Sequence, residues 1–135
     1  MKDSISIFKL LSDETRLRIL MLLDHCELSV CQLMGVLGVS QPLISRNLSL
    51  LSKGGFLDDR KDGKLVYYRI KGDLHVINRT AMQFLKSILK GDKTVQYDRE
   101  TLRDCLEFQK KAGRCDMETF EKFIEARRKA VSSGR

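Results

Sequence analysis

The chain has 135 residues, of which 42% are hydrophobic, and its 25 Lys and Arg against 18 Asp and Glu give a formal net charge of +7. This length and apolar content are typical of one folded domain with a real core and argue against a disordered chain. There is no long apolar run and no signal-peptide pattern. We therefore expect a cytoplasmic protein with no membrane partner, whose four cysteines are thiols.

Two helices are predicted at the start of the chain. The first covers about residues 3–11 and turns Ile7 and Leu11 to one side. Ser12 is expected to cap the second helix, which buries Leu20 among other apolar residues. These helices would supply part of the hydrophobic core.

The next two helices are separated by a tight turn. Ser29 and Gln32 form a capping box of the Ser-x-x-Gln kind, which predicts a helix that begins at Ser29. Gly38 is expected to end that helix in a left-handed conformation. A second helix then runs from Gln41 to Lys53, which is the spacing of a helix-turn-helix.

The second of these helices has two faces of opposite character. Ile44, Leu48 and Leu51 fall at i, i+4 and i+7 and form an apolar stripe. The other face is small, polar and cationic without a carboxylate, which suits entry into the DNA major groove. The residues expected to contact DNA here are Ser40, Gln41, Pro42, Ser45, Arg46, Asn47 and Lys53.

A β-hairpin is predicted after this helix. Asp62-Gly63 is a strong signal for a two-residue turn in which both positions need positive φ, and Val66, Tyr68 and Ile70 alternate along the return strand. A hairpin beside a helix-turn-helix makes a winged helix. The basic residues at its tip, expected to hold the DNA backbone or minor groove, are Arg60, Lys61 and Lys64.

Positive charge is concentrated on this part of the chain. Residues 1–39 hold four basic and five acidic side chains, whereas residues 40–71 hold seven basic and three acidic ones. An excess of this kind beside a winged-helix pattern is the electrostatic footprint of a phosphate-binding face. It favours double-stranded DNA as the partner.

The rest of the chain is predicted to be helical. A long helix covers about residues 73–90, a further helix begins at Asp98, and a last one begins at Asp116. The fold class is therefore mainly α with a small β-hairpin. We divide the chain into a winged helix-turn-helix domain at residues 1–95 and a C-terminal helical extension at residues 96–135.

Three segments together resemble the ArsR/SmtB metalloregulators, and the resemblance covers roughly residues 5–90. It implies a homodimeric winged-helix repressor that leaves an inverted-repeat operator when a metal, metalloid or thiol oxidant is sensed. The segments are residues 10–20 (LLSDETRLRIL), 27–33 (ELSVCQL) and 40–48 (SQPLISRNL).

The resemblance also places the dimer interface and shows two departures. The family dimerises through the first helix and the helix after the wing, which correspond to residues 5–11 and 73–90. The family usually has His where this chain has Asn47, which affects the operator sequence more than binding itself. Residues beyond about 95 extend past the usual family core.

The arsenic-responsive branch of the family carries Cys-Val-Cys at the start of the third helix, where this chain has Ser29-Val30-Cys31. Trivalent arsenic and antimony prefer about three soft thiolates, so Cys31 alone is not enough. An extension that folds back could bring Cys105 and Cys115 to Cys31, within one subunit or across the dimer. As(III) or Sb(III) is then the expected effector, and DNA binding itself requires no cofactor.

Other functions are open or disfavoured. A redox-sensing repressor that pairs Cys31 with an extension cysteine stays open, as does a winged-helix regulator with no metal effector. Zinc sensing is disfavoured because Asp73 and His75 supply only half of the family's zinc set and no later His exists. A winged helix that binds only proteins would not need Arg46 and Lys53 on its free face. No phosphate loop or nucleophile motif is present, so we expect no enzyme.

Overall fold

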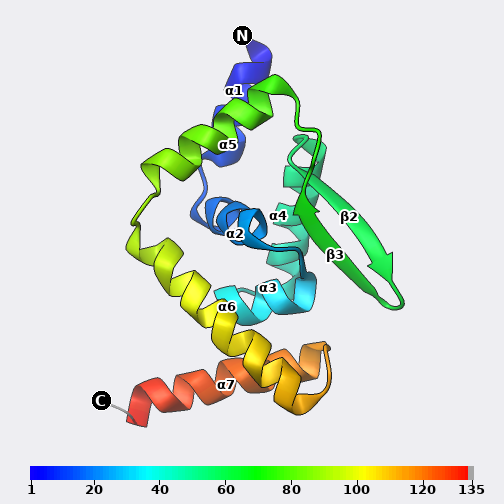
Figure 1. Ribbon diagram of the computed structural model, residues 1–135, viewed down its shortest axis with the longest axis vertical. Helices are drawn as coiled ribbons and strands as arrows, with labels where there is room; N and C mark the ends of the chain where they lie inside the picture. The colour runs from blue at the N-terminus through cyan, green and yellow to red at the C-terminus, as the bar shows by residue number, and fades with distance from the viewer. Residues whose placement is uncertain (134–135) are drawn as a thin grey trace.

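The computed structural model describes residues 1–133 as helices around a small antiparallel sheet, shown in Figure 1. The predicted class, mainly α with a small β-hairpin, is confirmed. No described helix is long and apolar enough to cross a membrane. The elements are α1 (Lys2–Leu11), α2 (Glu14–His25), β1 (Leu28–Ser29), α3 (Val30–Leu37), α4 (Gln41–Lys53), β2 (Leu57–Asp62), β3 (Leu65–Ile70), α5 (Val76–Ile88), α6 (Lys93–Ala112) and α7 (Met117–Ser133).

Local caps fix the helix-turn-helix. The Ser29 hydroxyl accepts from the Gln32 backbone N–H at 3.3 Å, and Gln32 Oε1 accepts from the Ser29 N–H at 2.9 Å, so the predicted capping box is confirmed. Gly38 ends α3 with a φ of 64°, as expected. Ser40 precedes α4 but makes no side-chain cap, and Asp13 rather than Ser12 caps α2.

The wing differs from its prediction by one residue. Asp62 pairs with Leu65 across the hairpin, so the turn consists of Gly63 and Lys64. Only Gly63 has a positive φ, at 62°, which a turn with glycine at its first position needs. The two-residue strand β1 pairs with the other edge of β3 and was not predicted, because a strand so short leaves no alternation to detect.

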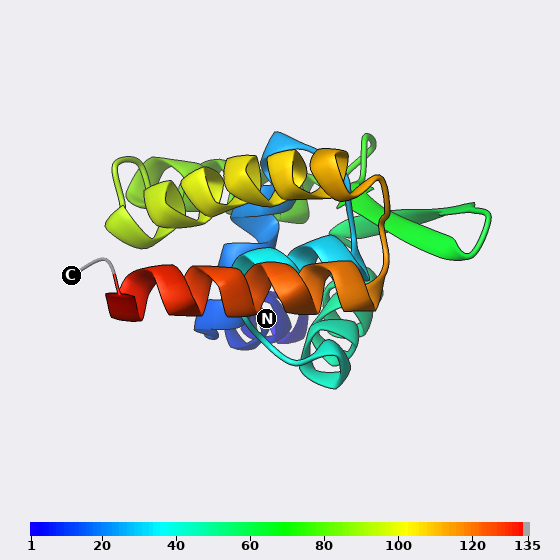
Figure 2. The same ribbon diagram turned by 90° about the horizontal axis from the view of Figure 1, so that it is seen from below.

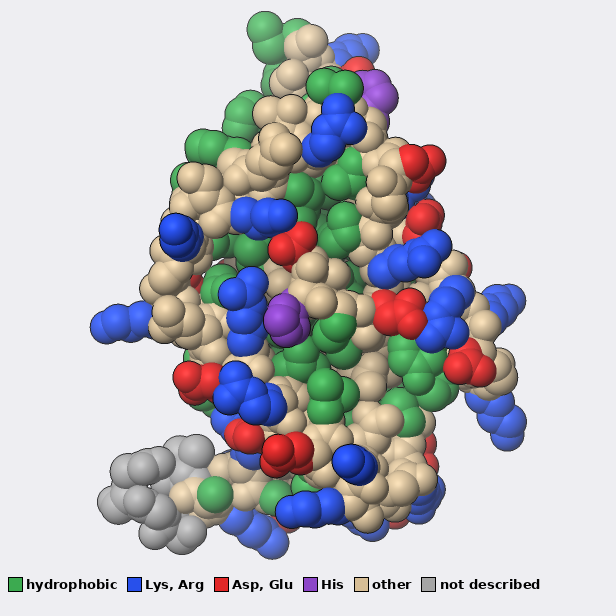
Figure 3. Space-filling model, viewed as in Figure 1, with side chains coloured by type: hydrophobic (Ala, Val, Ile, Leu, Met, Phe, Trp, Pro, Cys, Tyr) green, Lys and Arg blue, Asp and Glu red, His purple; other side chains and the backbone are tan. Residues whose placement is uncertain are grey.

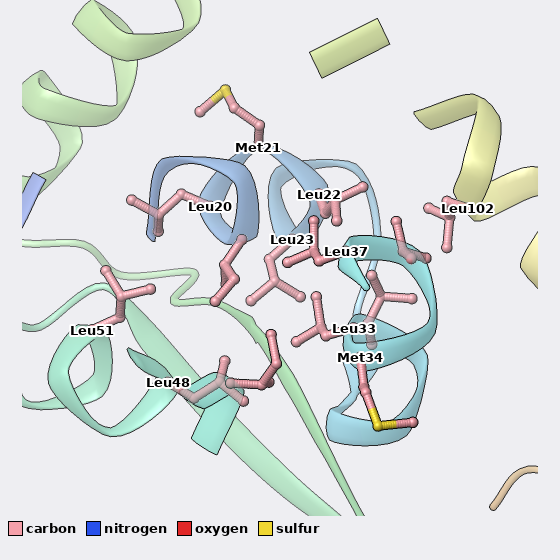
Figure 4. Packing of buried hydrophobic residues seen from close by; sticks show 14 of the residues in the cluster. Leu20, Met21, Leu22, Leu23, Leu33, Met34, Leu37, Leu48, Leu51 and Leu102 are labelled. Atoms are coloured by element: carbon pink, nitrogen blue, oxygen red, sulfur yellow. The ribbon is translucent and has the colours of Figure 1, made fainter. Parts of the chain in front are cut away.

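The core lies between α2, α3 and α4, as Figure 4 shows. α3 is buried on every side from Cys31 to Leu37, which requires cover on its outer face. That cover comes from the extension, since Leu102 of α6 and Phe120 of α7 belong to the same apolar cluster. Figure 2 shows α6 and α7 side by side with α3 behind them.

The start of the extension corrects one prediction. α6 begins at Lys93 and is capped by Asp92, whose side chain accepts from the Val95 N–H, so Asp98 does not begin a helix. Asp98 is instead buried and paired with Arg18 of α2. The predicted division between residues 95 and 96 falls inside the first turn of α6.

Helices α1 and α5 leave an apolar surface uncovered, which we name the apolar face. α5 is shorter than predicted because His75 caps it at Val76. Figure 3 shows hydrophobic side chains along the edge of the molecule where α1 and α5 lie. Residues of these two helices line an open groove of about 460 Å³. The large exposed residues of this face are Ile5, Phe8, Val76, Ile77, Phe84 and Ile88.

Candidate DNA-reading surface and cysteine cluster

The outward side of α4 is held in place by its buried stripe. Ile44, Leu48 and Leu51 have no exposed surface, so the opposite side of the helix must face solvent. On that side Arg46 and Lys53 are exposed and form no ion pair among the described residues. Free cations on a helix of this kind are available to bases and phosphates.

The first turn of α4 is also open to solvent. Ser40, Gln41 and Pro42 are exposed, and Pro42 occupies a first-turn position where a missing N–H costs nothing. Ser45 is half-buried, and its hydroxyl accepts from Gln41 Nε2 at 3.0 Å. These residues form one polar surface with Arg46.

Asn47 does not belong to that surface, which corrects the sequence prediction. Its side chain is 4% exposed, and its Oδ1 accepts from Arg16 Nη1 at 3.0 Å. Its Nδ2 donates to the Leu43 carbonyl at 3.0 Å. With all of its polar atoms directed into the protein, Asn47 holds α4 in place and cannot reach a base.

The three basic residues of the wing have different surroundings. Lys61 and Lys64 are exposed at the tip without an ion pair among the described residues. Arg60 is paired with Glu27, to which its Nε donates at 2.9 Å, and its guanidinium lies 4.8 Å from the centre of the Tyr67 ring. The hydrogen bond from Arg60 lowers the pKa of the Glu27 carboxyl. A phosphate must therefore compete with the Glu27 carboxylate for Arg60.

Three of the four cysteines come from segments that meet over α3. Cys31 lies in the first turn of α3, Cys105 lies in α6, and Cys115 lies between α6 and α7. Gly35 makes the close approach of α6 possible, because a Cβ there would lie 3.2 Å from Cys105 Sγ and 3.1 Å from the Phe120 ring. The extension thus folds back onto the helix that carries Cys31.

Burial makes two of these thiols harder to deprotonate. It raises the pKa of Cys105 to about 12 and raises that of Cys31, and the nearby Cys115 raises both further. Cys115 is half-buried, and it lies close enough to Cys31 and Cys105 to act on both electrostatically. Within residues 1–133 no three His, Cys, Asp or Glu side chains are arranged to hold a metal ion.

Two ion pairs, one on the wing and one in the core, were not predicted from the sequence. Glu27 stands inside a segment that resembles the family, but its pairing with Arg60 depends on the wing folding back across 33 residues. Asp98 has the appearance of a helix cap, yet its partner Arg18 is 80 residues away. Neither contact leaves a local signal in the sequence.

Comparison with known proteins identifies the family of this chain. Residues 13–59 match the model of the family described as "Bacterial regulatory protein, arsR family". The chain is 32% identical over 100 residues to the arsenical resistance operon repressor of Staphylococcus aureus, a match covering 67% of this chain and 96% of that protein. This chain belongs to the ArsR family.

A second relative and a solved structure agree with that assignment. This ArsR-family chain is 55% identical over 67 residues to the arsenical resistance operon repressor of Escherichia coli (strain K12), which is 49% of this chain and 57% of that repressor. It thus spans less than two thirds of the E. coli protein. The homodimeric winged helix-turn-helix DNA-binding domain Mb0332 of Mycobacterium bovis superposes with a TM-score of 0.57 at 26% identity, covering 68% of this chain and 82% of that one.

Proposed function

We propose that this ArsR-family chain is a transcriptional repressor that reads double-stranded DNA with α4 and leaves it when trivalent arsenic or antimony binds its cysteines. The observation that carries the proposal is the free cationic side of α4, beside a basic wing, on a fold shared with DNA-binding relatives. A DNA partner of this kind places the protein in the cytoplasm. DNA binding needs no cofactor.

The repressor acts as a homodimer on an inverted repeat. The apolar face of α1 and α5 packs against the same face of a second copy, which removes its exposed aromatic rings from water. Each α4 then enters a major groove, with half-sites about one helical turn apart. Arg46 and Ser45 face base edges, while Lys53, Lys61 and Lys64 face phosphates.

The effector binds through Cys31, Cys105 and Cys115. Arsenous acid exchanges its three hydroxyl groups for three thiolates, and each hydroxide leaves with a thiol proton as water, so no redox agent is consumed. Because no described group is already arranged for a metal ion, binding must draw the Cys115 segment and α6 toward Cys31.

This movement can be transmitted through α3 to the DNA-reading surface. α3 begins directly after β1, which pairs with wing strand β3, and it ends at Gly38 just before α4. An effector that prefers the drawn-in arrangement therefore favours a conformation in which α4 and the wing no longer match the operator.

The DNA half of the proposal is tested with Arg46→Ala. Fluorescence anisotropy on the DNA upstream of the gene should show a loss of about tenfold or more if Arg46 makes a bidentate base contact. Arg99→Ala, an exposed arginine on the far-lying α6, is the matched control and should bind as wild type does. Equal affinity for Arg46→Ala and wild type would remove α4 as the reading helix.

The effector half is tested with single cysteine variants. Cys31→Ser and Cys115→Ser should bind the same DNA normally but stay bound in arsenite, since each has lost one thiolate ligand. Cys26→Ser, the matched control outside the cluster, should be released as wild type is. Full release of Cys31→Ser would place the effector site elsewhere.

The proximity of Cys31 and Cys115 also fits a redox-sensing repressor. There a peroxide takes two electrons and two protons from the two thiols, which form a disulfide while the peroxide becomes two waters. Release from DNA by peroxide and not by arsenite would favour this second function.

A further inference from the structure

Buried amide side chains join the recognition helix α4 to the two helices of the apolar face. Asn47 of α4 and Asn78 of α5 are 4% and 7% exposed, although Asn is a residue usually found at the surface. A buried amide without partners is costly, so the bonds that satisfy these two groups are strongly favoured. Each of them links α4 to a different neighbour.

The first link runs from the middle of α4 through α2 to α1. Arg16 donates from Nη1 to Asn47 Oδ1 at 3.0 Å and from Nε to the Leu10 carbonyl at 2.5 Å. Leu10 lies in the last turn of α1. One planar guanidinium therefore holds α4 and α1 at a fixed separation, and its fork geometry makes the link directional.

The second link fixes the C-terminal end of α4. Asn78 Nδ2 donates to the carbonyl of Gly54, the residue that ends α4, at 2.8 Å. α1 packs on the same glycine, since a Cβ there would lie only 2.4 Å from Leu10 Cδ2. Gly55 continues the turn with a φ of 87° directly against the Asn78 amide. This end of α4 is thus held by α5 and α1 together.

We propose that Asn47 and Asn78 are positioning residues that fix the angle of α4 against α1 and α5, and so set the half-site spacing that the dimer reads. This inference rests on the proposed function, in which α1 and α5 join the two copies and α4 reads the DNA. An apolar stripe alone lets a helix roll or slide by small amounts, whereas two directional bonds at different points along α4 prevent this. Any rotation of α4 is doubled across a twofold dimer.

The test measures spacing preference rather than affinity alone. Wild type, Asn47→Leu and Asn78→Ala are titrated by fluorescence anisotropy against the DNA upstream of the gene, and against the same DNA with one base pair added to or removed from its centre. One base pair turns a half-site by about 35°, so wild type should prefer its natural spacing by about 30-fold or more. The variants should lower that preference to about fivefold or less, because their α4 helices adopt a range of angles.

Two further variants separate positioning from folding. Asn78→Asp keeps the size of the side chain but cannot donate to the Gly54 carbonyl, so it should flatten the preference as Asn78→Ala does. Gln83→Ala, an exposed residue on the same helix with no partner among the described residues, is the matched control and should keep the full preference. Circular dichroism and sedimentation check that each variant is folded and dimeric.

The outcomes distinguish this inference from the function on which it rests. A flattened preference in folded, dimeric variants supports the positioning role. A uniform loss on all three DNAs, with the preference intact, overturns it and leaves the two amides as ordinary stabilising groups. Failure of wild type to bind any of the DNAs overturns the proposed function and this inference with it.

Discussion

At position 98 a carboxylate lies in the interior with 1% of its residue surface exposed, and it accepts bonds of 2.9 and 2.8 Å from Arg18 Nε and Nη2. These bonds raise the pKa of the Arg18 guanidinium. Arg18→Ala would leave the Asp98 charge buried and unpaired, so urea unfolding should show a loss of about 3 kcal/mol. The exposed control Arg103→Ala should change stability by less than about 0.5 kcal/mol, and an equally small loss in Arg18→Ala would contradict this assignment.

The cysteines should react in an order that follows burial. Since the thiolate is the reactive form, the pKa of about 12 at Cys105 leaves almost no thiolate at pH 7.5, and its fraction rises as the pH rises toward 12. Iodoacetamide labelling followed by peptide mass spectrometry should find Cys105 last and Cys115 well before it at pH 7.5. The rate at Cys105 should increase between pH 7.5 and 9.5. Labelling of Cys105 as fast as that of Cys115 would show that α6 does not stay packed on α3.

Among the elements, those governed by local rules could be predicted from the sequence. The capping box at Ser29 and the left-handed Gly38 placed α3 within one residue, because each rule involves neighbours along the chain. The predicted start of α6 at Asp98 is wrong, because Asp92 caps the helix and Asp98 pairs with the distant Arg18. A side-chain pair between distant segments, such as Arg18 and Asp98, produces no periodic pattern in the sequence.

The candidate site divides in the same way. The apolar stripe of α4 predicted which side faces outward, and Arg46 and Lys53 are on that side. Asn47 was misassigned because its helical position borders both faces, and its burial depends on Arg16, which reaches it from α2. Cys105 can pack against α3 because Gly35 has no side chain there, and the sequence does not show which helix packs on that glycine.

One cation of the wing, Arg60, is already paired with a carboxylate. Arg60 is bound to Glu27 and stacked on Tyr67, so a phosphate must compete with a carboxylate for it. Glu27→Gln should tighten DNA binding severalfold and steepen the dependence of log K on log salt by about one unit, because one more cation becomes available. Asp59→Asn removes the same charge from the same region without touching Arg60 and is the control for net charge. If both variants tighten binding equally, the Glu27 pairing has no specific role.

At the scale of the whole molecule, the apolar face predicts an obligate dimer. Phe8 and Phe84 are 68% and 59% exposed in a single copy and lie on either side of one groove. Phe84→Glu should place a charge in the proposed interface and give a monomer in analytical ultracentrifugation, with operator affinity at least about 100-fold lower because only one half-site is read. Lys86 lies on the same helix but pairs with Asp24 away from the groove, so the control Lys86→Gln should stay dimeric. A dimeric Phe84→Glu would place the interface elsewhere.

The measurement that tests the central claim most directly is a fluorescence-anisotropy titration of the reduced full chain on the DNA upstream of its gene, repeated with arsenite, antimonite, zinc, cadmium and a peroxide. We predict tight, salt-sensitive binding that arsenite and antimonite release at concentrations near that of the protein, while zinc leaves it unchanged. Binding that neither arsenite nor antimonite releases would contradict the thiolate-sensing account, and no binding in any condition would contradict the assignment of α4 as a DNA-reading helix.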